Sequence, residues 1–191
     1  CRCVLVPGDL RDPQKCKVIV DRCVKEFGHV DILVNNAAYQ NECTFEEITP
    51  EQLDRTFRTN IYAYFWMAQY LLAHMKEGAV IINTGSVTAQ QGNHKLIDYS
   101  ATKGAIHTFT KSLASYLSDR CIRVNCVAPG PVFTPLIPAT LSKEHVAKFG
   151  KETMWGRPAQ PVEISPSFVF IASDDGRYYS GEVFSPTGRG T

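Results

Sequence analysis

Tyr99 and Lys103 are the two residues whose types and spacing best suit acid–base chemistry in this sequence. They are four positions apart, so in a helix their side chains lie on one face, a turn apart. An ammonium beside a phenol stabilises the phenolate and lowers the tyrosine pKa from about 10 toward the range that a general acid or base needs. An exposed surface pair is the competing interpretation, because chance alone produces such spacings among 8 Tyr in 191 residues.

Ser86 and Asn60 extend this hypothesis, each with an ordinary alternative. Ser86 ends a predicted strand, and its hydroxyl could hold a carbonyl or alcohol oxygen while Tyr99 exchanges a proton with it. A serine in that position is also a common turn former. Asn60 lies within an apolar helical stretch, where its amide needs partners, and a hydrogen bond in the core would satisfy it as well as a site would.

Short apolar runs alternate with helical patterns along the whole chain. The predicted strands cover residues 4–6, 32–34, 80–82, 122–128 and 182–184. The predicted helices cover residues 13–27, 49–78, 99–118, 142–149 and 165–172. Strands that alternate with helices pair in parallel through right-handed crossovers, so the expected fold class is α/β, a doubly wound parallel sheet in a single domain.

The carboxyl ends of the strands should carry the site, because ligands of doubly wound sheets bind there. Several polar or flexible segments directly follow predicted strands and are expected to share one rim. These are Asp9 and residues 35–36, 84–86 and 129–130.

Composition excludes several other classes of function. A net charge of +1 leaves no broad basic face for nucleic acid. The longest uncharged stretch, residues 59–75, is too short and too polar for a membrane span of about 20 residues. The 7 cysteines include no C-x-x-C pair and no histidine at metal-ligand spacing, so we predict no metal site. Free core thiols favour a reducing, cytoplasmic location.

Five motifs in order resemble the short-chain dehydrogenase/reductase family, from about Val4 to Gly188. They are residues 35–38 (Asn-Asn-Ala-Ala), the helical Asn60, Ser86, Tyr99-x-x-x-Lys103 and Pro129-Gly130-x-x-x-Thr134. The resemblance implies a Rossmann-like fold and hydride transfer between NAD or NADP and an aldehyde, ketone, sugar or alcohol. Residues 96–106 and 127–138 are most similar to glucose/ribitol dehydrogenase-like or NADPH-dependent aldehyde reductases. That similarity alone slightly favours NADP.

The resemblance also implies a role for each matching residue. Tyr99 would be the acid/base, and Lys103 would lower its pKa and bind the nicotinamide ribose. Ser86 would orient the substrate oxygen, and Asn60 would hold a water in a proton relay to Lys103. The implied cofactor-binding residues are Asp9, Leu10, Asn35, Ala37, Tyr99, Lys103, Pro129, Gly130, Val132 and Thr134. Residues 131–160 would cover the substrate as a lid, although by their pattern they are only a Pro-rich loop and an amphipathic helix.

The sequence departs from the family pattern in lacking a glycine-rich turn for the cofactor phosphates. We therefore expect an N-terminally truncated domain without its first two strands, which leaves strand edges exposed. Two alternatives stay open: a truncated, non-catalytic remnant that only associates with other subunits, and an epimerase or dehydratase on a similar fold.

The resemblance implies homodimers or homotetramers that pair through helices 49–78 and 99–118. The aromatic-rich residues 61–66 suit such burial, but core packing would also explain them.

Overall fold

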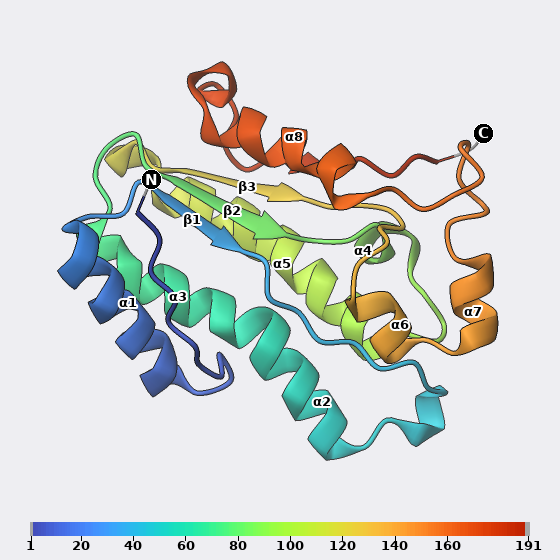
Figure 1. Ribbon diagram of the computed structural model, residues 1–191. Coiled ribbons are helices and arrows are strands. Elements are labelled where there is room, and N and C mark those ends of the chain that lie inside the picture. The colour runs from blue at the N-terminus through green and yellow to red at the C-terminus, as the bar shows by residue number, and fades with distance from the viewer. Residues whose placement is uncertain (1, 190–191) are drawn as a thin grey trace.

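The computed structural model describes residues 2–189 and contains a four-stranded parallel sheet. The strands lie in the order β1 (Ile32–Asn35), β2 (Val80–Thr84), β3 (Arg123–Val127) and β4 (Val183–Phe184) (Figure 1). Ile32 pairs with Val80, which in turn pairs with Arg123. The predicted α/β class with a doubly wound parallel sheet is confirmed.

Eight α-helices are described in residues 2–189. They are α1 (Pro13–Phe27), α2 (Pro50–Phe57), α3 (Ala63–Leu71), α4 (Thr88–Gln91), α5 (Ile97–Tyr116), α6 (Leu136–Thr140), α7 (Lys143–Lys148) and α8 (Pro161–Ala172). A π-helical turn lies at Arg58–Tyr62, and 3₁₀ turns lie at Phe45–Glu47, Leu72–His74, Ser118–Arg120 and Asp174–Gly176.

The sheet separates two apolar cores. Helices α1, α3 and α5 lie on one side of it and α8 on the other (Figure 1). Alternate residues of β2 face opposite ways, so Ile81 joins the larger core, whereas Val80 and Ile82 pack with Ile164 and Ile171 of α8. A strand buried on both faces reads as a continuous apolar run, which is the pattern that predicted it.

Local capping signals set several helix ends where the sequence predicts them. The Asp12 carboxylate accepts a hydrogen bond from the Gln14 N–H at 2.8 Å and begins α1. Gly28 ends the same helix with a φ of 83°, a conformation that glycine adopts without steric cost. The Thr49 hydroxyl accepts from the Gln52 N–H and begins α2.

The long helix predicted over residues 49–78 is interrupted in the structure. The Ala63 N–H bonds to the Arg58 carbonyl, five residues back instead of four, so a π-helical turn separates α2 from α3. Such turns are frequent at functional sites, and Asn60 lies within this one. The residues carry no glycine or proline that would have signalled the irregularity.

Helix α8 begins at Pro161, four residues before the predicted start. A capping box explains the earlier start: Glu163 accepts from the backbone N–H of Gln160 at 2.8 Å, and Pro161 occupies the first turn. Pro166 therefore lies inside the helix instead of near its beginning.

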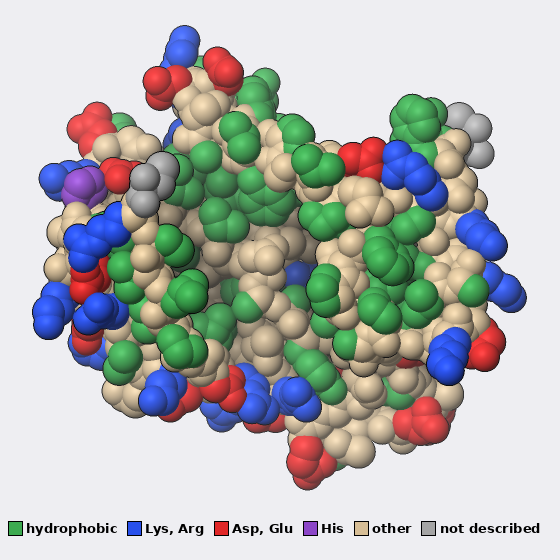
Figure 2. Space-filling view, in the orientation of Figure 1, with side chains coloured by type: hydrophobic (Ala, Val, Ile, Leu, Met, Phe, Trp, Pro, Cys, Tyr) green, Lys and Arg blue, Asp and Glu red, His purple; other side chains and the backbone are tan. Residues whose placement is uncertain are grey.

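The strand predicted at residues 4–6 is wrong for the described chain, because this segment pairs with no strand there. A strand needs a neighbour to accept its hydrogen bonds, and β1 is the last strand on that side of the sheet. The exposed edge that we expect is present: Ile32 and Val34 are 45% and 47% exposed. Figure 2 shows apolar side chains gathered in a hollow of the surface below α8.

None of the helices between residues 2 and 189 combines the length and the apolarity that crossing a lipid bilayer requires.

Candidate active site

A cavity of about 930 Å³ opens past the carboxyl ends of β1, β2 and β3. This is where the topology of a doubly wound sheet places a ligand. Most of the predicted site residues line it: Ala37, Ser86, Tyr99, Lys103, Pro129, Gly130, Val132 and Thr134. Asn36, Thr84 and Gly85 also line it, so the shared rim predicted for the ends of these strands is present, except for Asp9 and Asn35.

Helix α5 presents Tyr99 and Lys103 to the cavity one turn apart. The Lys103 Nζ lies 5.4 Å from the centroid of the Tyr99 ring and donates to the Thr84 carbonyl at 2.6 Å. Lys103 is only 1% exposed, and Tyr99 is partly buried. The two residues are therefore not an exposed surface pair.

Burial shifts the pKa of both groups away from the charged form. The pKa of Tyr99 is raised to about 12 by desolvation, which outweighs the lowering effect of a hydrogen bond with Ser86. Desolvation likewise lowers the pKa of Lys103 to about 8. The predicted lowering of the tyrosine pKa is thus not found, because desolvation of the phenol by burial outweighs the effects that favour the phenolate.

Ser86 follows β2 and combines the two roles that the sequence left open. Its Oγ accepts hydrogen bonds from the Thr88 N–H at 3.2 Å and the Thr88 hydroxyl at 3.0 Å, as a turn-forming serine does. The same residue is 8% exposed, lines the cavity and interacts with the Tyr99 hydroxyl. Ser86 is the acceptor in both contacts with Thr88, so neither contact uses the proton of its own hydroxyl.

The Asn60 side chain is fully buried and joins two parts of the structure. Its amide donates to the Tyr39 carbonyl at 2.8 Å and to the Thr102 hydroxyl at 3.1 Å, and its oxygen accepts from the Tyr39 N–H at 2.7 Å. Both amide protons are thus used within the protein. Asn60 itself does not line the cavity, but it ties the segment after β1 to the residue beside Lys103.

Three predicted cofactor residues lie outside the cavity wall. The buried Asn35 amide donates to Asn83 at 3.0 Å within the core. Asp9 is exposed and forms an ion pair with Arg11 at 2.6 Å, which holds the pKa of its carboxyl at about 2. Leu10 packs against the larger core. Asp9 misses the rim because the segment before it is not part of the sheet.

Asp98 is a buried residue of this site that the sequence analysis missed. Its carboxylate accepts from the Tyr99 N–H at 2.8 Å and from the Thr56 hydroxyl at 2.7 Å, and so it fixes the start of α5 against α2. Only its position one residue before Tyr99 could have indicated it.

We expect Asp98→Ala to lower the free energy of unfolding by about 3 kcal/mol, because three donors, on Tyr99, Thr56 and Gln52, lose a buried acceptor. Urea denaturation measures the loss, with exposed Asp119→Ala as the matched control. A loss within about 0.5 kcal/mol, the range of a surface substitution, would contradict the role assigned to Asp98.

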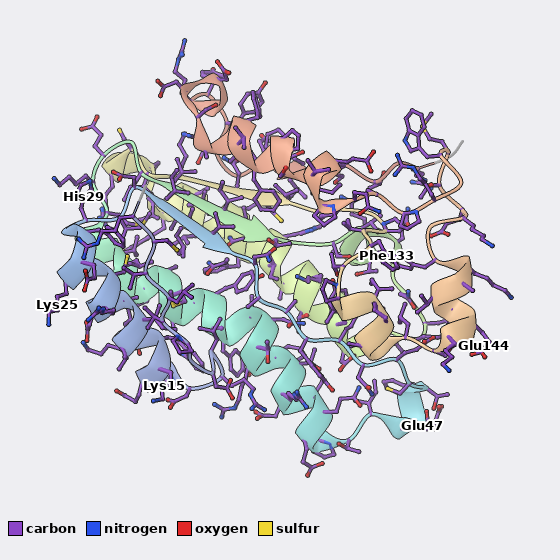
Figure 3. The ribbon with its side chains drawn as sticks, viewed as in Figure 1. Lys15, Lys25, His29, Glu47, Phe133 and Glu144 are labelled. Atoms are coloured by element: carbon purple, nitrogen blue, oxygen red, sulfur yellow. The ribbon has the colours of Figure 1, made fainter. Side chains whose placement is uncertain are left out.

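The remaining wall of the cavity comes mostly from residues outside the five motifs. Residues 131–160, with α6 and α7, form one side of it; Phe133 and Glu144 mark this segment in Figure 3. Glu42, Lys95 and His145 also line the cavity, from three separate segments. The sequence gives no signal for this convergence, because it depends on long-range packing.

Comparison with known proteins agrees with this geometry. A family model described as enoyl-(acyl carrier protein) reductase matches residues 1–188. A crystal structure of a short chain dehydrogenase from Burkholderia cenocepacia J2315, in complex with NADP, is 28% identical, with a TM-score of 0.87. The similarity covers 95% of this chain and 74% of that one. The chain belongs to the short-chain dehydrogenase/reductase family.

Two curated members of the short-chain dehydrogenase/reductase family show greater sequence similarity. Glucose and ribitol dehydrogenase of Daucus carota is 52% identical over 97% of this chain. NADPH-dependent aldehyde reductase 1, chloroplastic, of Arabidopsis thaliana is 50% identical, also over 97%. The chain spans only 64% and 65% of the lengths of these two relatives.

Proposed function

We propose that the protein is an oxidoreductase that transfers a hydride between NADP(H) and a carbonyl or alcohol substrate. The observation that carries the proposal is the meeting of Ser86, Tyr99 and Lys103 in one cavity. A proton donor, a hydrogen-bonding hydroxyl and a cation thus converge where a doubly wound sheet binds its ligand.

The residues present fit the nicotinamide half of such a cofactor. The Lys103 ammonium has three donors, and the hydrogen bond described for it uses one, on Thr84. A buried cation with donors left over suits the hydroxyls of a ribose, and Pro129, Val132 and Thr134 supply a facing wall of the cavity. The diphosphate half has no glycine-rich turn in this sequence.

Two names in the comparisons favour NADP over NAD. One relative is named an NADPH-dependent aldehyde reductase, and the Burkholderia structure is in complex with NADP. The names of the relatives also suggest the substrate class, an aldehyde or a sugar and its alcohol. One relative is named chloroplastic, so the cytoplasmic location expected from the cysteines stays a prediction.

Proton transfer falls to the chain's own residues, while the bound nicotinamide would supply or accept the hydride. In reduction, Tyr99 gives its proton to the substrate oxygen, and the Ser86 hydroxyl donates a hydrogen bond to that oxygen. With a pKa of about 12, the Tyr99 phenol is protonated at neutral pH, which is the form that reduction needs.

Lys103 and Asn60 act around this proton transfer in the proposal. The Lys103 ammonium, with its pKa of about 8, compensates negative charge that develops on the Tyr99 oxygen. Asn60 uses both amide protons on Tyr39 and Thr102, so it can take part in a water relay only as an acceptor, through its backbone carbonyl or through the side-chain oxygen that already accepts from the Tyr39 N–H.

Titration of the 191-residue chain with NADPH, followed by fluorescence, tests the proposal against the alternative of a non-catalytic remnant. Saturable micromolar binding, with NADPH oxidation on adding an aldehyde or glucose, supports an oxidoreductase. Absence of binding and turnover up to millimolar NADPH supports the remnant. Ribitol with NADP tests the reverse direction.

We also propose that copies of the chain pair through α2, α3 and α5. The aromatic run divides between the core and the surface: Ile61 and Tyr64 are buried, whereas Tyr62 and Phe65 are 42% and 50% exposed. Such half-exposed aromatic side chains suit a subunit interface. Sedimentation of the chain distinguishes a dimer or tetramer from a monomer.

A further inference from the structure

Three polar side chains from distant parts of the chain meet in the wall of the cavity. Glu42 lies in the segment between β1 and α2, Lys95 lies just before α5, and His145 lies on α7. The Glu42 carboxylate is 2.8 Å from the His145 Nδ1 and 3.2 Å from the Lys95 Nζ. The Lys95 Nζ is in turn 2.9 Å from the His145 Nε2. Each side chain therefore contacts the other two.

The hydrogen bonds of this cluster determine where the histidine carries its proton. An ammonium can only donate, so the His145 Nε2 must accept from Lys95. The ring proton then sits on Nδ1, from which it is donated to Glu42. The carboxylate, which is 15% exposed, thus receives one donor from the main body of the fold and one from α7.

Helix α7 has little else to hold it in place. Among its six residues, Lys143–Lys148, none is buried, so no apolar side chain anchors it in either core. The neighbouring α6 does have an anchor, because Ile137 is buried and Gln40 donates to Thr140 at 2.8 Å. The contacts of His145 with Glu42 and Lys95 join α7 to the segment after β1 and to the residues before α5.

We propose that Glu42, Lys95 and His145 form a latch that holds α7 against the cavity and so positions the substrate. Glu42 is the centre of the latch because its carboxylate accepts from both other members. Glu42 and Lys95 are also held together by the backbone, because the Lys95 carbonyl accepts a hydrogen bond from the N–H of Cys43, the residue after Glu42, at 3.2 Å. This role rests on the proposed function only for its effect on the substrate.

The test compares hydrogen exchange in α7 of Glu42→Ala with that of Glu144→Ala. Glu144 is an exposed carboxylate on α7 that does not line the cavity, so it controls for loss of charge (Figure 3). We expect Glu42→Ala to speed exchange of the backbone amides in residues 143–149 about tenfold, the effect of losing one charged hydrogen bond, and Glu144→Ala to leave it within about twofold. His145→Ala should speed exchange at least as much as Glu42→Ala, because it also removes the hydrogen bond that Lys95 donates to the ring, and the double variant should exchange no faster than His145→Ala.

Kinetics supply a second readout. For Glu42→Ala we expect the KM for the carbonyl substrate to rise about tenfold, with kcat and the Kd for NADPH within about twofold, because uniform binding is lost and the reacting groups are untouched. Unchanged exchange in residues 143–149 of Glu42→Ala, or equal acceleration by Glu144→Ala, overturns the latch. Absence of activity in the parent chain counts against the proposed function alone, because the exchange comparison needs no turnover.

Discussion

Tyr99→Phe is expected to reduce kcat for carbonyl reduction by about 10³-fold, within the range that general acid catalysis contributes. The substitution removes the hydroxyl and keeps the ring, whose centroid lies 5.4 Å from the Lys103 Nζ. Packing and the cation–π contact therefore remain, while the proton donor is lost. The Kd for NADPH should stay within about twofold, because phenylalanine still fills the same wall of the cavity.

The measurement is steady-state kcat together with a fluorescence titration of NADPH for the parent chain and the variant. Tyr116→Phe is the matched control, because Tyr116 lies on the same helix and is 76% exposed. It should leave both quantities unchanged. Full turnover by Tyr99→Phe would refute the acid role assigned to Tyr99, and a large loss of NADPH affinity would reassign that residue to cofactor binding.

Lys103→Met is expected to abolish turnover and yet stabilise the fold. Desolvation lowers the pKa of Lys103 from 10.5 to about 8, so the buried ammonium costs about 3 kcal/mol at neutral pH. Methionine has a similar length and carries no charge, although it leaves the Thr84 carbonyl without its donor at 2.6 Å. A net gain of about 1–2 kcal/mol in unfolding free energy remains after about 1–2 kcal/mol for that lost hydrogen bond.

The destabilising effect of the buried Lys103 ammonium should also appear in how the free energy of unfolding changes with pH. Between pH 8 and 10.5 the unfolded chain keeps a proton on Lys103 that the folded chain has released, so unfolding becomes harder as the pH rises. The parent chain should gain stability across that window relative to Lys103→Met. Denaturation at pH 7 and pH 10 measures the difference.

Lys111→Met, an exposed site on the same helix, is the control and should behave like the parent chain. Equal pH dependence in the parent chain and Lys103→Met would show that the Lys103 ammonium is not destabilised by burial. Turnover close to that of the parent chain would contradict its part in the proposed proton transfer.

Local signals in the sequence predicted most of the elements. Asp12, Thr49 and Gly28 act within a few residues of themselves, so the helix ends that they set could be recognised without any knowledge of the tertiary structure. The spacing of Tyr99 and Lys103 likewise needed only a helix to bring them to one face. The parallel sheet followed from alternating strands and helices.

Predictions were less successful where a residue's environment depends on distant segments. The pKa of Tyr99 was expected to fall because of Lys103, but burial raises it, and burial is set by the whole fold. Asn35 was expected just past a strand, but it is the last residue of β1, and its side chain bonds to Asn83 inside the core. The strand at residues 4–6 failed because a strand exists only with a partner, which the described chain does not provide.

The sequence by itself determined the fold class, the rim of strand ends and three residues of the proposed catalytic set, because periodicity and short spacings encode local geometry. The tertiary structure alone decided the π-helical turn at Asn60, the ionisation of Tyr99 and Lys103, and the meeting of Glu42 with His145. The last two residues are 103 positions apart. Contacts of that range arise from packing of the whole chain, which no local pattern records.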